Sequence, residues 1–175
     1  IVAEIEHTLL RPEYRALRDA DGARRELAFT LLDGDACFEG TLDLVAPSRD
    51  GYRILDVKSG SGMAGLEMDA AVIERRVARY DIQRTLYTRA VEKLTGVRVA
   101  GFAFDFTGAG VQADATLTPS TSGGAAERLA AELAQLASGA DMLTTDTESC
   151  NFCGYRTAGW CPGAQGKIAT SLTSG

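Results

Sequence analysis

The sequence has few cysteines, one histidine and one tryptophan, and its 175 residues contain no long apolar run. Four cysteines and glycines without a period exclude a disulfide scaffold and a collagen-like chain. Without about 18 consecutive apolar residues, we expect no membrane-spanning helix. Without a charged and then apolar leader, we expect a cytoplasmic protein. The chain begins at Ile1 instead of Met, from which we expect a fragment of a longer protein.

Basic residues are also scarce. Lys and Arg number 18 against 24 Asp and Glu, which gives a net charge of -6. Proteins that bind nucleic acid without sequence preference are usually basic, because neutralising phosphates supplies their affinity. If this protein contacts nucleic acid, a local basic stripe or a basic partner must therefore supply the attraction.

The pattern of apolar residues predicts strands and helices in alternation. Alternating apolar residues predict strands over 25–32, up to Val45, and over 52–58. Helical spacing predicts helices over 3–19, 71–94 and 127–136, and the second should end at Gly96. A fourth strand is expected over 97–106 and a small hairpin over 108–116. This order predicts an α/β fold with a central mixed sheet flanked by helices.

Two of the predicted strands carry charged residues among apolar neighbours. They read GTLDLV around Asp43 and ILDVKS around Asp56. Because strand side chains alternate between faces, Leu42 and Leu44 should point away from Asp43. For the same reason Asp56 should share a face with Lys58. A hairpin would bring the two carboxylates together, and they would then need a positive neighbour, either Lys58 or a Mg²⁺ or Mn²⁺ ion.

The predicted helix over 71–94 carries a second polar motif. Gln83 and Tyr87 are four residues apart and therefore share one helix face. The apolar face, which should be buried, consists of Ile82, Leu86, Ala90 and Leu94. Taken alone, this motif fits a solvated stripe, and a D-x-K tripeptide taken alone fits an ion pair on an edge strand. Next to a carboxylate site, the stripe is better explained as a surface that contacts phosphates or bases.

The motifs occur in one order: Gly40-x-x-Asp43, Asp56-x-Lys58 and Gln83-x-x-x-Tyr87. In this order they resemble the RecB-type branch of the PD-(D/E)XK nucleases, and the segment 25–29 resembles the strand entry of that branch. The chain is similar to nuclease modules of AddAB-like helicase–nuclease repair enzymes and to four-cysteine CRISPR adaptation nucleases. The resemblance implies a restriction-endonuclease-like core over 1–149. It also implies a DNA nuclease for repair, recombination or defence, acting on single strands or duplex ends beside a helicase subunit or domain.

The resemblance also implies roles for the residues of the two strands. Asp43, Asp56 and the main-chain carbonyl of Val57 would bind Mg²⁺ or Mn²⁺. Lys58 would hold the attacking water and stabilise the negative charge that develops on the phosphate. A bound metal lowers the pKa of water and neutralises charge in the transition state.

The same resemblance implies supporting roles for residues outside these two strand segments. Gln83 and Tyr87 would orient DNA or the active-site lysine, and Glu26 is a weaker candidate for support. The branch commonly has a metal-binding histidine on a helix upstream of the first strand. That ligand is either His7 or a histidine that precedes this chain.

Three cysteines lie close together near the end of the chain: Cys150, Cys153 and Cys161. In a reducing compartment, clustered cysteines favour a metal over a disulfide. They are similar to the C-terminal part of the iron–sulfur staple of the same nucleases, which implies a [4Fe–4S] cluster on the segment 150–175. Such a cluster needs four thiolates, so its fourth ligand is not identified. Zn²⁺ is the alternative metal.

Two further expectations concern residues related to these cysteines. Cys37 shares a strand face with Asp43 by parity and should be a small, half-buried residue. The rings of Phe152, Tyr155 and Trp160 should pack around the cluster and shield it.

Two alternative functions remain open at this point. The first is a catalytically inactive module that keeps the fold and binds DNA ends or a partner, which the acidic balance favours. The second is a zinc-stabilised structural module whose carboxylates are surface charges.

Overall fold

The computed structural model describes most of the first two thirds of the chain and parts of the rest. The described residues are 6, 8–33, 36–59, 69–115, 117, 130–131, 133–135, 137–138 and 153–161. The chain forms two compact units, Ile1–Leu129 and Ala130–Gly175, and each is treated by itself below. The domain boundary predicted before Cys150 lies outside the described residues.

The first unit is built on a five-stranded sheet. Its strands are β1 (Arg24–Asp33), β2 (Ala36–Ser48), β3 (Gly51–Lys58), β4 (Val99–Phe106) and β5 (Val111–Ala115), and they lie side by side in chain order. Only β3 and β4 pair in parallel; the other neighbours are antiparallel. This confirms the predicted mixed sheet. The β2–β3 hairpin turns more tightly than expected, because Pro47 and Ser48 still belong to β2.

Helices connect and cover the strands. They are α2 (Pro12–Arg18), α3 (Ala70–Arg79), α4 (Asp81–Thr95) and the 3₁₀ turn η2 (Thr107–Ala109), whereas the short helix α7 (Gly154–Thr157) belongs to the second unit. The predicted helix over 71–94 is two helices that break at Tyr80, and α4 ends at Gly96 as predicted, with φ 70°. Within the helix predicted over 3–19, Arg11 is extended, because the residue before a proline avoids the α region. The helix α2 therefore starts at Pro12. The described helices include none long and apolar enough to span a membrane.

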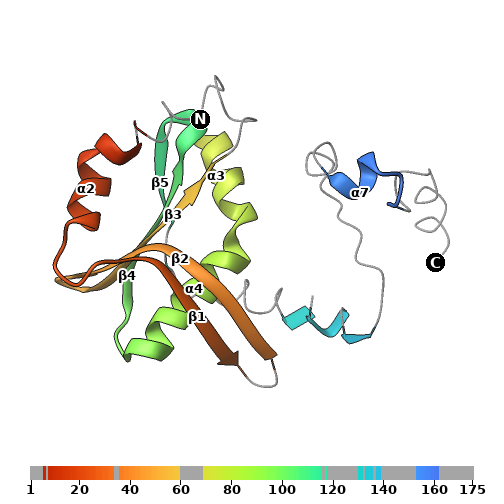
Figure 1. Cartoon of the computed structure of the whole chain (residues 1–175), viewed down its shortest axis with the longest axis horizontal. Coiled ribbons are helices and arrows are strands. Elements are labelled where there is room, and N and C mark those ends of the chain that lie inside the picture. The colour runs from red at the N-terminus through yellow and green to blue at the C-terminus, as the bar shows by residue number, and fades with distance from the viewer. Residues whose placement is uncertain are drawn as a thin grey trace. The chain divides into compact units, whose positions relative to one another are not determined.

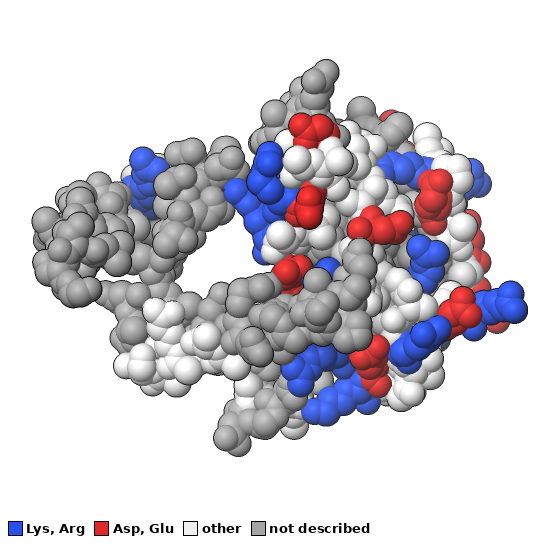
Figure 2. Space-filling model, turned by 180° about the vertical axis from the view of Figure 1, so that it is seen from behind, with Lys and Arg blue, Asp and Glu red and all other residues white. Residues whose placement is uncertain are grey.

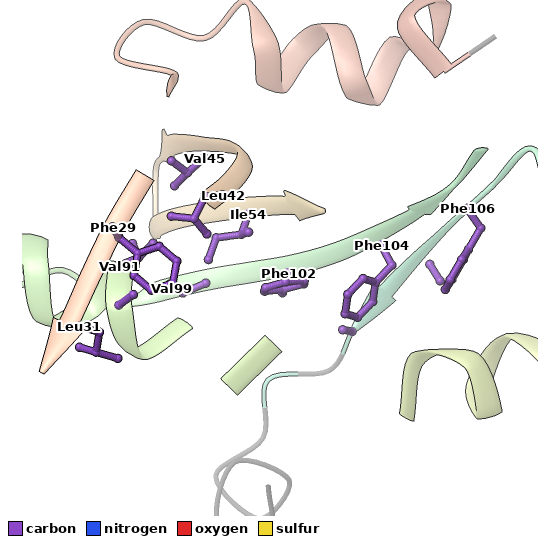
Figure 3. Packing of buried hydrophobic residues seen from close by; sticks show 13 residues of the cluster. Phe29, Leu31, Leu42, Val45, Ile54, Val91, Val99, Phe102, Phe104 and Phe106 are labelled. Carbon is purple, nitrogen blue, oxygen red and sulfur yellow. The ribbon is translucent and has the colours of Figure 1, made fainter. Parts of the chain in front are cut away.

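Helices cover both faces of the sheet (Figure 1). On one face, α3 and α4 pack over the main core, where Phe102, Phe104 and Phe106 follow one another along β4 (Figure 3). On the other face, Tyr14 and Leu17 of α2 pack against a smaller cluster of Leu44, Leu55 and Ala103. Both faces of the central strands are therefore buried, as a parallel β–α–β connection requires.

A buried ion pair holds α2 to the back of the sheet. Arg11, at the N-cap of α2, places its Nη1 atom 3.1 Å from Oδ1 of Asp105 in β4. The Asp105 side chain is fully buried and Arg11 is nearly so. Asp105 lies opposite Val57 in the parallel register, directly behind the strand segment that carries Asp56 and Lys58.

Along β1 and β2, the regular alternation of side chains between the two faces of the sheet is interrupted near Glu26. Glu26 has φ 48°, a left-handed conformation that is uncommon outside glycine, while β1 and β2 stay paired on both sides of it. Leu42 joins the core under α4, whereas Leu44 joins the cluster under α2. The prediction that these two leucines share a face is therefore wrong. Because the side chains change sides here, Gly40 and Asp43 can both face α4.

Candidate active site

Acidic and basic side chains meet at the end of β3, on the face covered by α3 and α4. Asp43 of β2 reaches across to β3, where its Oδ2 atom accepts a hydrogen bond of 2.6 Å from the backbone N–H of Val57. Asp56 is 2% exposed, and its Oδ2 atom lies 2.5 Å from Nζ of Lys58. The negative charge of Asp43 acts on Asp56, so the two carboxylates lie near each other as the spacing predicted.

Gln83 of α4 closes these contacts into a ring. Its Oε1 atom accepts a hydrogen bond of 2.6 Å from Nζ of Lys58. Its Nε2 atom donates a hydrogen bond of 3.1 Å to Oδ1 of Asp56. One amide thus binds the lysine and the aspartate at once, and this fixes both side chains relative to α4.

Aromatic rings surround the lysine. Nζ of Lys58 lies 4.3 Å from the centre of the Tyr80 ring and 5.7 Å from that of Phe104. Tyr80 itself packs on Phe104 and Phe106, with ring centres 5.3 and 6.4 Å apart. The sequence placed Tyr80 inside one long helix, near the polar stripe of Gln83 and Tyr87, and did not predict its contact with Lys58. The acidic residue after it, Asp81, suits the first turn of a helix and is the signal that could have located the break.

Tyr87 stands one turn further along α4 and packs over β1 and β2. Its ring meets the Phe29 ring edge-on at 5.5 Å. A Cβ atom added at Gly40 would lie 2.8 Å from the Phe29 ring and 3.5 Å from the Tyr87 ring. Because glycine has no side chain, the two rings can occupy the space next to position 40. This gives a physical reason for Gly40 in the Gly40-x-x-Asp43 motif.

The environment shifts two pKa values in the site. Burial raises the pKa of Asp56, and the charge of Asp43 adds to this, while the hydrogen bond and charge of Lys58 oppose it. Burial also raises the pKa of Tyr87, helped by the charges of Asp56 and Asp43 and opposed by a hydrogen bond with Gln83. The Tyr87 hydroxyl is therefore protonated at neutral pH and can donate a hydrogen bond.

The donor set of the site suits a hard divalent cation. Oδ1 of Asp43 accepts no hydrogen bond from the described residues, and Asp56 lies beside it. Both oxygens of Asp56 are engaged, one by Gln83 and one by Lys58. The described part of the chain contains no group of three or more His, Cys, Asp or Glu side chains that could hold a metal. Two carboxylates, a main-chain oxygen and water form a set that Mg²⁺ and Mn²⁺ accept, because these ions keep several waters.

Other predicted residues lie elsewhere or outside the described chain. His7 is outside the described residues. Glu26 is exposed, and its visible contribution is the left-handed backbone described above. Cys37 is exposed, so the prediction of a half-buried residue is wrong; the outer part of β2 projects beyond the core. On α4, Leu94 is 61% exposed, which corrects the predicted apolar face.

Buried polar residues take the place of that predicted face. Arg84 and Thr85 are buried on α4 together with Ala90 and Val91. The Arg84 guanidinium stays paired one turn away, with Nη2 2.7 Å from Oδ1 of Asp81. Ala90 is buried as predicted, and an arginine with an acidic partner three residues earlier is buried beside it although it was not part of the predicted apolar face.

In the second unit, Cys153 and Cys161 are free thiols on either side of α7, each half-buried. Cys150 and Phe152 lie outside the described residues. Tyr155 and Trp160 are 67% and 75% exposed. The prediction that these two rings are buried around a cluster is therefore wrong for the arrangement described here.

Comparison with known families agrees with the geometry of the site. A family model described as the PD-(D/E)XK nuclease superfamily matches residues 1–162. This range contains the whole sheet, the Asp56–Lys58–Gln83 ring and all three clustered cysteines. No curated protein sequence matches the chain significantly.

Proposed function

The chain belongs to the PD-(D/E)XK nuclease superfamily, and we propose that it hydrolyses phosphodiester bonds in DNA with Mg²⁺ or Mn²⁺. One observation supports this most directly: Asp56 and Lys58 form a buried ion pair that Gln83 holds from both sides. An ordinary ion pair on an edge strand is exposed and contributes little. Here β3 is an interior strand, and Asp56 is buried beside a second carboxylate.

The described contacts support a division of roles among these residues. Asp43 and Asp56, with the Val57 carbonyl, would hold the metal, which supplies an activated water and neutralises charge on the phosphate. Lys58, held in place by Gln83 and by the Tyr80 ring, would orient that water and stabilise the developing negative charge.

DNA contacts would come from the helix faces next to the ring. Tyr87 and Gln83 lie on α4, and α3 adds two exposed arginines, Arg75 and Arg79, with the half-buried Arg76. In the view of Figure 2, basic and acidic side chains are interspersed over the described residues. Such a surface attracts DNA weakly. We therefore propose a RecB-type module that receives single strands or duplex ends from a helicase subunit or domain.

We also propose that the cysteine segment carries a [4Fe–4S] cluster, with Zn²⁺ as the alternative. Cys153 and Cys161 are free thiols, and Cys150 completes a tight C-x-x-C spacing. Protein purified without oxygen should contain iron and inorganic sulfide, and a Cys153→Ser variant should lose both. A zinc content of one ion per chain without sulfide would identify the structural zinc site instead.

The nuclease proposal is tested by incubating labelled single- and double-stranded DNA with Mg²⁺, Mn²⁺ or EDTA. Cleavage should require the metal and should be lost in Asp43→Asn, because the carbonyl of Asn can still accept the Val57 hydrogen bond but lacks the charge. A Glu39→Gln variant, an exposed acid on the same strand, is the matched control and should cleave normally. Folded protein that binds DNA in EDTA but never cleaves would support the inactive binding module instead.

A further inference from the structure

Two aromatic side chains of the second unit are largely exposed, although large aromatic side chains are usually mostly buried. Trp160 is 75% exposed and Tyr155 is 67% exposed. They lie within the segment 153–161, which reads CGYRTAGWC and contains one arginine and no acidic residue. Arg156 is thus the one charged residue among the described residues 153–161.

The backbone holds the two rings in a fixed relation. The Tyr155 carbonyl accepts hydrogen bonds from the N–H groups of Trp160, at 2.9 Å, and Cys161, at 3.2 Å. Gly159 supplies the left-handed turn between them, with φ 73°. The ring centres are 6.0 Å apart at 66°. Neither ring shields the other from solvent, so each can present a face to a ligand without rearrangement of the turn.

We propose that Tyr155 and Trp160 form a stacking platform for unpaired bases of the DNA substrate. This inference rests on the proposed function. Every base has a flat π-face, so stacking on aromatic side chains binds single strands without sequence preference. Arg156, which lies between the two aromatic residues in the sequence and is exposed in α7, is a basic side chain close to them along the chain.

Trp160 is the only tryptophan of the chain and reports directly on this surface. A short oligodeoxythymidylate, added to the full chain in EDTA so that nothing is cleaved, should quench its fluorescence. An abasic oligonucleotide of the same length carries the same phosphates without bases and should leave the emission unchanged. In anisotropy measurements with labelled oligodeoxythymidylate, Tyr155→Ala should weaken binding about fivefold or more. Trp160→Phe keeps a ring and should bind within about twofold of the natural chain.

The controls separate this inference from the nuclease proposal. Leu32 on β1 is 66% exposed, and Leu32→Ala should not change binding. Equal quenching by the abasic strand would show phosphate binding and overturn the stacking platform, as would unchanged emission on adding oligodeoxythymidylate. If metal-dependent cleavage persists in that case, the nuclease proposal stands alone. If bases quench Trp160 but no cleavage occurs, the platform stands and the nuclease proposal fails.

Discussion

Lys58→Met should lower the rate of DNA cleavage by about a hundredfold to a thousandfold, the usual cost of losing one group that stabilises charge in a transition state. The Lys58 contact with the Tyr80 ring is made by the ammonium and is lost with it, but methionine keeps most of the side-chain length and can pack on the ring, so the core under α3 should stay packed. Only the ammonium is lost. The measurement is single-turnover cleavage of labelled DNA at saturating Mg²⁺.

The same variant should bind the metal more tightly. In the metal-free protein the Lys58 ammonium lies on Oδ2 of Asp56 and competes with a divalent cation for that oxygen. A charge-assisted hydrogen bond contributes about 1.5–3 kcal/mol, so its removal should tighten Mn²⁺ binding about tenfold in a calorimetric titration. The titration should be made at alkaline pH. Without Lys58 the pKa of Asp56 rises further, and below that pKa the protonated carboxyl no longer attracts the cation.

Asp56→Asn is the matched comparison. It should also lose cleavage, but it should weaken Mn²⁺ binding, because it removes a charged ligand. Opposite shifts in affinity for two variants that are both inactive would show that Lys58 and the metal share Asp56. Equal weakening in both variants would contradict this and would make Lys58 a structural support of the metal site.

The sequence predicted which of these residues lie together, because each motif lies within one element. Asp56 and Lys58 are two residues apart on a strand, and Gln83 and Tyr87 are four apart on a helix, so the local period alone places each pair on one face. The order of the elements then brought the two pairs together. Gly40 was part of the predicted motif, but the reason why this position needs a glycine is visible only in the packing of the Phe29 and Tyr87 rings.

The errors arise where tertiary contacts override the local pattern. A left-handed Glu26 has no local signal, yet it shifts the alternation of two strands and moves Leu42 and Leu44 to opposite faces. Tyr80 interrupts a continuous helical pattern because its ring packs on β4 and over Lys58. The residues that Tyr80 contacts are distant in sequence, so apart from the local signal of Asp81 no window of neighbouring residues contains the information about this break.

The Arg11–Asp105 ion pair also joins residues that are distant in the sequence. Breaking it should strongly destabilise the first unit. Asp105→Asn should lower the free energy of unfolding by about 3–5 kcal/mol, because it leaves the charge of a nearly buried arginine without its anion. The measurement is urea unfolding followed by circular dichroism, compared at equal slope. An exposed ion pair such as Arg18–Asp19 serves as the control, and Asp19→Asn should leave the stability nearly unchanged.

A double variant separates the ion pair from the space it fills. Arg11→Met combined with Asp105→Leu removes both charges and keeps most of the buried volume, so it should recover most of the lost stability. The recovery is expected because the cost in the single variant is a buried charge without a counter-ion, not a lost attraction. The cleavage rate of the double variant should then show whether the ion pair only holds α2 against the sheet or also affects the active site. Since Asp105 is paired with Val57 between Asp56 and Lys58, a stable but slower double variant would mean that the charge pair also holds the catalytic strand in register.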